Sequence, residues 1–133
     1  MALPVPTPPL GVHLGTKGGL AGAVREADRI GATALQVFTS SPQIWRDPDA
    51  AIAFQEARVA WGGHPVVVHD SYLINLAAST EELREKSYVA FVDELDRCAT
   101  YGVGLVNSHM GAHVGQGEPE GIRLVGLALR RLL

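Results

Sequence analysis

Residues 65–70 read Pro-Val-Val-Val-His-Asp, and this short stretch decides the fold class. Three consecutive valines make both faces of a strand apolar, which is typical of parallel sheets that helices cover. The strand then ends in an imidazole, His69, and a carboxylate, Asp70. In parallel α/β proteins, functional side chains gather where the strands end. The stretch therefore predicts a buried strand that leads into a candidate site.

The same succession of an apolar run, a polar loop and a helical period occurs four times along the chain. Strands are predicted at residues 10–14, 33–38, 66–69 and 103–108, followed by helices at about 18–30, 47–61, 79–101 and 119–133. Such βα units form a parallel sheet, either open and doubly wound or closed as an eight-stranded barrel. The chain has about half of the roughly 250 residues of a full barrel. We therefore expect an α/β fold, a partial TIM (β/α)8-like barrel with outer helices.

Composition sets limits on domains and partners. With 133 residues, of which 47% are hydrophobic and 19% charged, the chain suits one globular domain. We expect a flexible, proline-rich tail at residues 1–9 and a single domain over residues 10–133. No apolar run approaches the roughly 20 residues of a membrane helix, so no membrane partner is expected. A single cysteine, Cys98, fits the cytoplasm.

The net charge of -3 disfavours a nucleic-acid partner unless the positive field is local or comes from bound metal. The third helix should begin at the capping box Ser79-Thr-Glu-Glu82. On this helix Cys98 falls on the apolar stripe, whereas Glu94 is expected on the solvated face.

Histidines lie at or near the ends of three of the four predicted strands. His13 lies late in the first strand, His69 closes the third, His109 closes the fourth, and His113 follows in the next loop. Adjacent strands lie roughly 4.8 Å apart, so His69 and His109 could point at one shared position. Zinc binds imidazole nitrogen, and Asp70 could either ligate it or orient His69. The alternative is that these are hydrogen-bonded histidines without a metal.

Two aromatic residues, Trp45 and Tyr72, are placed in loops on the same face of the sheet. Exposed there, they can stack on a nucleic-acid base or simply seal the rim of a barrel. Asn75, three residues after Tyr72, can bind substrate or cap the next segment.

Four segments of the chain resemble endonuclease IV, the zinc-dependent apurinic/apyrimidinic endonucleases of base-excision repair. They are Gly11-Val-His-Leu-Gly-Thr-Lys-Gly-Gly-Leu20, Phe38-Thr39 with Trp45-Arg46, His69-Asp-Ser-Tyr-Leu-Ile-Asn-Leu76 and Asn107-Ser-His-Met-Gly-Ala-His113. The third is the most specific. The resemblance runs from about Leu10 to the end but corresponds to only the N-terminal half of a family member.

The resemblance implies an enzyme with zinc at the mouth of a TIM-like barrel, which hydrolyses double-stranded DNA 5′ to abasic sites. It implies that His69 and His109 bind one zinc, with at most a partial site in this chain. His13, Asp70 and His113 would lie near that site. The expected DNA-binding residues are Gln43, Trp45, Tyr72 and Asn75. Alone, this half is expected to be inactive or weakly active, and its open sheet edges could self-associate.

The chain departs from the family pattern at three positions. Gln43 stands where the family often has an arginine, and Ser108 and Met110 replace an aromatic residue and a proline around His109. Two other functions remain open on the sequence. One is a metal-dependent sugar isomerase or epimerase on a similar barrel, and the other is a non-catalytic half-barrel module for binding or assembly.

Overall fold

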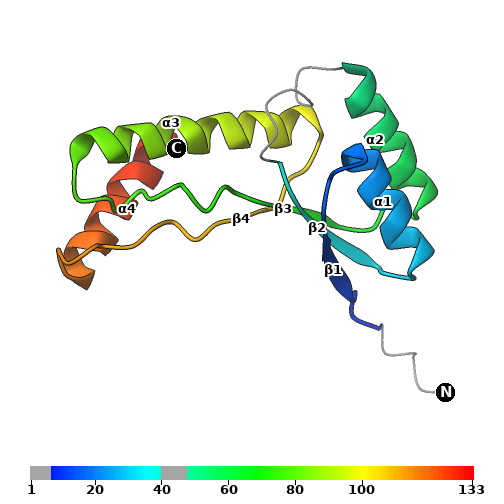
Figure 1. Ribbon diagram of the computed structural model, residues 1–133, viewed down its shortest axis with the longest axis horizontal. Helices are drawn as coiled ribbons and strands as arrows, with labels where there is room; N and C mark the ends of the chain where they lie inside the picture. Colours follow the sequence, from blue (N-terminus) through cyan, green and yellow to red (C-terminus); the bar gives the residue numbers. More distant parts are fainter. Residues whose placement is uncertain (1–6, 40–47) are drawn as a thin grey trace.

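A computed structural model describes residues 7–39 and 48–133 (Figure 1). Four strands alternate with four helices along this part of the chain. They are β1 (Gly11–Leu14), α1 (Gly19–Arg29), β2 (Ala34–Phe38), α2 (Pro48–Ala60), β3 (Val66–His69), α3 (Glu81–Thr100), β4 (Val106–Asn107) and α4 (Glu118–Leu132). Most of the predicted tail, residues 1–6, lies outside the described residues.

The strands form one parallel sheet in the order β1-β2-β3-β4. Val37 pairs with Val68, and the next pair, Phe38 with His69, brings the ends of β2 and β3 to the same level. Right-handed connections between sequential parallel strands place the connecting helices on one face of the sheet. This arrangement confirms the predicted α/β fold with the start of a TIM-like barrel.

The main core lies between the sheet and the helices that follow β1 and β2, which run side by side in Figure 1. Leu35 and Val37 of β2 alternate with less buried residues, so only one face of this strand is covered. Buried residues of the helices, including Val24 and Phe54, pack against that face. The opposite face, with His13 and Gln36, corresponds to a barrel interior and is open here.

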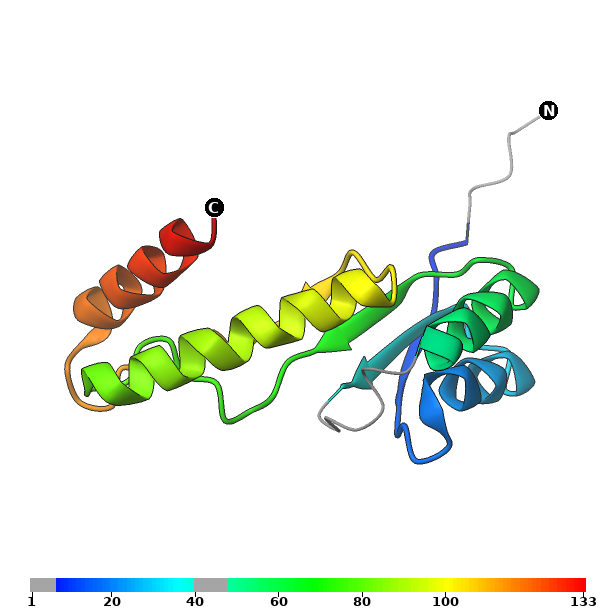
Figure 2. The ribbon, with the colours of Figure 1, turned by 90° about the horizontal axis from the view of Figure 1, so that it is seen from above.

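A second apolar cluster lies at the other end of the long helix α3, where α4 packs (Figure 2). It joins Ile74 and Leu76 of the β3–α3 loop to Phe91 of α3 and to apolar residues of α4. The loop that follows His69 is therefore held by its own small core. Arg131 of α4 also forms an ion pair with Glu85 of α3.

The start of α3 differs from the prediction by one residue. Thr80, not Ser79, caps the helix, and its hydroxyl oxygen accepts a hydrogen bond from the Leu83 N–H. Both residues carry the hydroxyl that an N-cap needs, so the pattern alone does not decide between them.

The fourth strand is shorter than the predicted range of residues 103–108. The N–H of Val103 donates to the carbonyl of Cys98 and closes the end of α3 after Gly102, which has a φ of 63°. Val103 therefore belongs to a helix cap, and regular pairing begins only at Val106.

The prediction that Glu94 lies on the solvated face of its helix is wrong. Glu94 is 1% exposed and forms a 2.6 Å ion pair with Arg97. Burial raises the pKa of Glu94 more than Arg97 lowers it, and the negative charge of Asp70 adds to the rise. Cys98, one turn later, is core as predicted, and burial raises the pKa of its thiol to about 11. No helix among the described residues is both long and apolar enough to cross a membrane.

Candidate metal and DNA site

A row of rings crosses the carboxyl ends of the strands. The centroids of His13 and Phe38 lie 4.5 Å apart, those of Phe38 and His69 lie 5.0 Å apart, and those of His69 and His109 lie 5.0 Å apart. Four rings from the ends of four neighbouring strands therefore meet on one edge. The sequence predicted that His69 and His109 lie together but missed Phe38, which ends its strand in the same way.

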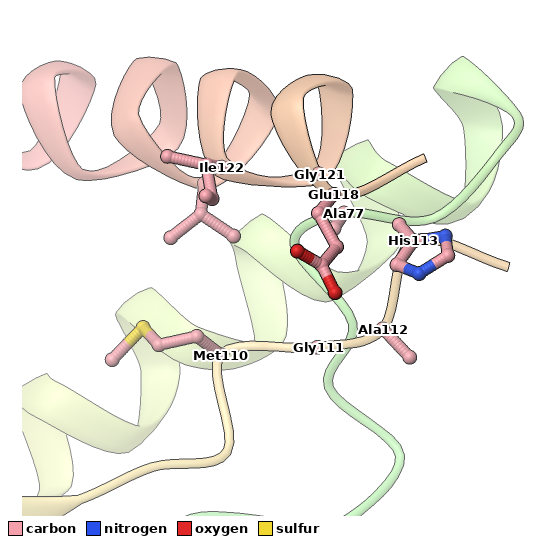
Figure 3. A pocket seen from close by; sticks show the side chains of 9 residues that line it. Ala77, Met110, Gly111, Ala112, His113, Glu118, Gly121 and Ile122 are labelled. Atoms are coloured by element: carbon pink, nitrogen blue, oxygen red, sulfur yellow. The ribbon is translucent and has the colours of Figure 1, made fainter. Parts of the chain in front are cut away.

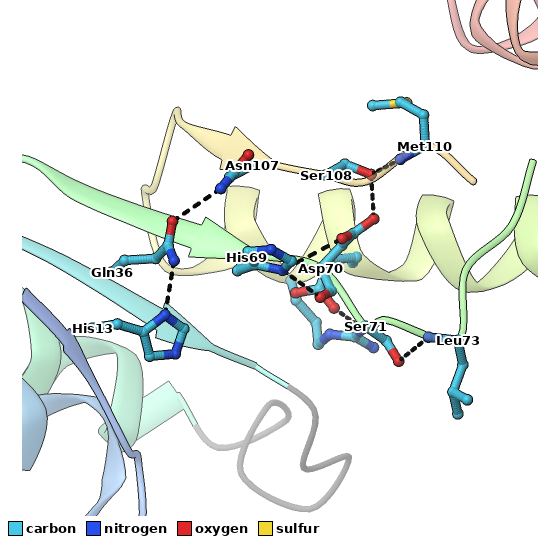
Figure 4. A network of polar contacts seen from close by, with 11 residues as sticks. His13, Gln36, His69, Asp70, Ser71, Leu73, Asn107, Ser108 and Met110 are labelled. Carbon is cyan, nitrogen blue, oxygen red and sulfur yellow. Dashed lines mark hydrogen bonds and ion pairs between the residues drawn. The ribbon is translucent and has the colours of Figure 1, made fainter. Parts of the chain in front are cut away.

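Amide side chains form a second row on the open face of the sheet (Figure 4). The Gln36 Nε2–H donates to His13 Nδ1 over 2.7 Å, and the Gln36 oxygen accepts from Asn107 Nδ2 over 3.1 Å. Since Nδ1 of His13 accepts this bond, its proton lies on Nε2. Neither Gln36 nor Asn107 was a candidate from the sequence, although both fall on the face opposite the buried Val37 and Val68.

The tautomer of His69 follows from its neighbours. His69 is 8% exposed, and its Nδ1 lies 2.8 Å from the backbone carbonyl oxygen of Asp70. A carbonyl only accepts hydrogen bonds, so Nδ1 carries the proton and the lone pair lies on Nε2. Metal-binding histidines are commonly oriented by such a bond from the second ring nitrogen. His69 is therefore held through Nδ1, which leaves Nε2 as the nitrogen that could bind a metal.

Asp70 is 1% exposed and connects the ends of β3 and β4. Its Oδ2 accepts a hydrogen bond from the Ser108 hydroxyl, and its N–H donates to the carbonyl of Asn107 over 3.0 Å. Its Oδ1 lies 3.6 Å from His69 Nδ1 and has no hydrogen-bond partner among the described residues. The carboxylate thus lies behind the two histidines, on the protein side.

The site offers zinc two imidazole ligands, which do not complete its coordination shell. No group of three or more His, Cys, Asp or Glu side chains within residues 7–39 and 48–133 is arranged to hold a metal. The pair of His69 and His109 fits half of a tetrahedral zinc shell in its chemistry. His13 lies at the far end of the row, beyond Phe38.

Tyr72 and Leu73 project from the loop that follows His69. They are 81% and 74% exposed, although the loop around them is ordered by its own hydrogen bonds. The Ile74 N–H donates to the Ser71 carbonyl, and the Leu73 N–H donates to the Ser71 hydroxyl over 3.3 Å. An exposed tyrosine and leucine at the tip of a tight turn form an apolar wedge beside the histidine pair.

Asn75 links this loop to the one after β4. Its side-chain oxygen accepts from the N–H groups of Ala77 and Ala112, each over 3.0 Å, and its Nδ2 donates to the Ala112 carbonyl over 3.0 Å. Gly111 allows the close approach, because a Cβ there would lie 2.0 Å from the Asn75 oxygen. Asn75 thus positions both loops, and its predicted contact with DNA stays a prediction.

His113 belongs to a different set of contacts. It lines a mainly apolar hollow of about 390 Å³ at the start of α4, together with Met110, Glu118 and Ile122 (Figure 3). Its Nδ1 accepts a hydrogen bond from the Gly117 N–H over 3.2 Å. The other two predicted DNA-binding residues, Gln43 and Trp45, lie outside the described residues.

A family profile described as "Xylose isomerase-like TIM barrel" matches residues 24–133. The chain belongs to this family. The TIM-barrel expectation is thereby met by the family match as well as by the parallel sheet. Within the family, the similarity is to endonuclease IV, as the resemblance of the four segments indicated.

Curated relatives carry the name "Probable endonuclease 4". The relative from Chloroflexus aurantiacus is 43% identical over 130 residues, which are 95% of this chain and 46% of that protein. The relative from Geobacter sulfurreducens is 42% identical over 129 residues, covering 93% of this chain and 43% of that protein. The chain therefore spans about half the length of the curated relatives it matches.

Solved structures agree with this similarity. Endonuclease IV from Thermus thermophilus superposes with a TM-score of 0.77 at 43% identity, covering 94% of this chain and 47% of the other. D-Psicose 3-epimerase from Clostridium cellulolyticum superposes with a TM-score of 0.70 at 12% identity, covering 92% of this chain and 46% of the other. The second match reflects a shared fold alone.

Proposed function

We propose that this chain provides the N-terminal half of an endonuclease IV-type phosphodiesterase, which hydrolyses duplex DNA 5′ to abasic sites in base-excision repair. The observation that carries the proposal is the pair of imidazoles of His69 and His109, 5.0 Å apart at the strand ends, with the exposed Tyr72 in the loop that follows His69. The similarity to proteins named endonuclease 4 supports the choice of this reaction over others on the same fold.

His69 and His109 are the residues that would hold zinc. The Nε2 lone pair of His69 is available because its Nδ1–H donates to the Asp70 carbonyl. His109 is exposed at the adjacent strand end, so its ring is open to a ligand. When bound, zinc supplies an activated hydroxide and neutralises phosphate charge. Bound metal would also provide the local positive field that the net charge of -3 does not.

Tyr72 and Leu73 would act on the DNA. Apolar side chains that enter a duplex from the minor groove unstack base steps and kink the helix. An abasic nucleotide has no base to unpair, so it leaves the stack at a lower cost than an intact nucleotide. The turn at Ser71 holds the two side chains in place before binding. Gln43, Trp45 and Asn75 are proposed to contribute further contacts.

Replacing Tyr72 with alanine should weaken binding of this chain to a duplex with one abasic site by about 5- to 150-fold. The range follows from the roughly 1–3 kcal/mol that one aromatic–base contact contributes. Fluorescence anisotropy at fixed salt measures the effect, with the Val89→Ala variant as control, because Val89 is exposed on the outer helix α3. Equal affinities of the Tyr72→Ala variant and the unaltered chain would speak against a role in DNA binding.

The open sheet edges at β1 and β4 are proposed to pair with another chain. The edge strand β4 has only two paired residues, and Leu105 beside it is 53% exposed. Unpaired strand edges are templates for association. Sedimentation velocity should therefore show dimers or larger species at high protein concentration, and a strict monomer would contradict this pairing.

A further inference from the structure

We propose that Asp70 and Ser108 are positioning residues, which hold the imidazole of His109 beside that of His69. The inference rests on the proposed function, since it assigns a task to two residues behind the metal-binding pair.

Hydrogen bonds hold the residues on both sides of His109 in the sequence. The Ser108 hydroxyl donates to Oδ2 of the buried Asp70, and the Ser108 oxygen accepts from the N–H of Met110 over 3.1 Å. Residues 108 and 110 are the two neighbours of His109 in sequence. The backbone that carries the His109 side chain is therefore held by one carboxylate, as Figure 4 shows for Asp70, Ser108 and Met110.

The same carboxylate residue also orients the other histidine. The Asp70 carbonyl accepts the Nδ1–H of His69 over 2.8 Å, and the Asp70 N–H donates to Asn107 over 3.0 Å. Asp70 is 1% exposed, so water competes little for these bonds. One residue thus fixes His69 through its main chain and His109 through Ser108. The distance between the two rings depends on this connection.

Ser108 and Met110 are parts of one arrangement. Met110 has a φ of 43° and uses its N–H for the bond to Ser108. A proline at this position would have no N–H and a φ fixed near −65°, so it could not make the same turn. Ser108 provides the side-chain oxygen that accepts this N–H. The serine and the methionine therefore fit each other.

A matched pair of variants tests the role of the hydroxyl. Ser108→Thr keeps the hydroxyl, whereas Ser108→Val has nearly the same shape as the threonine variant without it. We expect the Ser108→Val variant to bind zinc about 10- to 100-fold more weakly than the unaltered chain, the usual effect of losing a residue that orients a metal ligand. The Ser108→Thr variant should keep the original affinity. Competition with a chromophoric chelator measures the zinc affinity.

The control is Thr100→Val, which removes an exposed hydroxyl of α3 that donates to the Asp96 carbonyl and lies outside the proposed site. It should leave zinc affinity unchanged. The visible absorption of bound Co²⁺ adds a readout of ligand geometry, which should change in Ser108→Val and stay constant in Ser108→Thr. Circular dichroism confirms that each variant is folded.

Two results would overturn the inference, and they are distinguishable. Equal zinc affinity and equal Co²⁺ spectra for the Ser108→Thr and Ser108→Val variants would refute the positioning role and leave the proposed function intact. Failure of the unaltered chain to bind either metal would refute the proposed metal site and the inference together. A weaker Ser108→Val variant beside an unaffected Thr100→Val variant is the supporting result.

Discussion

Replacing His109 with alanine should lower the zinc affinity of the chain by about 100-fold or more. The variant removes one of the two imidazoles proposed to hold zinc among the described residues, so the loss should exceed the roughly 10- to 100-fold range expected for a residue that merely orients a ligand. His109 is exposed, and its removal leaves no buried cavity. Isothermal titration with zinc measures the change directly.

The matched control is His64→Ala. His64 packs edge-to-face on Trp61 with ring centroids 5.0 Å apart, at the start of β3 and away from the strand ends. This variant should bind zinc like the unaltered chain. Unchanged zinc affinity in His109→Ala would mean that the imidazole pair does not hold the metal. His69→Ala is less informative, since His69 is 8% exposed and its loss also perturbs the fold.

Replacing Phe54 with alanine should lower the free energy of unfolding by about 3–5 kcal/mol, the usual cost of removing a buried phenylalanine. Phe54 is 1% exposed and is the buried residue through which α2 joins the core. Its ring meets that of Tyr101 edge-to-face, with centroids 5.7 Å apart. Without it, the apolar contact of α2 with the core is reduced to that of Ala51 and Ala57. Urea unfolding followed by circular dichroism gives the difference.

The control on the same helix is Val59→Ala. Val59 is 75% exposed, so its truncation should change the free energy of unfolding by about 0.5 kcal/mol or less. A similar loss in both variants would show that the stability of the chain does not depend on the packing of Phe54.

The sheet was predictable because its signals are local. Three valines in a row predict that β3 is a strand of a parallel sheet packed against helices. The polar residues that follow the valines mark the end of the strand. Parallel pairing then brings His69 beside Asn107, and the ring of His109, two residues later in the chain, lies with its centroid 5.0 Å from that of His69.

Glu94 shows how a charge can mislead. It lies three residues after Phe91 and four before Cys98, so it falls on the buried stripe of α3, yet its carboxylate suggested a solvated face. Arg97, one turn later, offsets part of the cost of burial through a 2.6 Å ion pair. The position of Glu94 on the helix therefore predicted its burial better than its charge did. The arginine three residues later, Arg97, also indicated that a buried carboxylate would have a partner.

The contacts between loops could not be predicted from the sequence. The bonds of Asn75 to Ala112 and of Ser108 to Asp70 join residues 37 and 38 positions apart. They depend on loop backbone conformations, including the positive φ of Met110, which no periodicity encodes. The arrangement that orients the candidate site is therefore visible only in three dimensions.

The proposed repair function is tested most directly by cleavage of a duplex that carries one abasic site. Because the chain covers 47% of the Thermus thermophilus enzyme, residues 1–133 should be joined to the C-terminal half of that enzyme. We expect the folded, zinc-loaded hybrid to cut the strand 5′ to the abasic site and to lose this activity on His109→Ala. A folded hybrid that binds zinc but leaves the abasic duplex intact would contradict the proposed function.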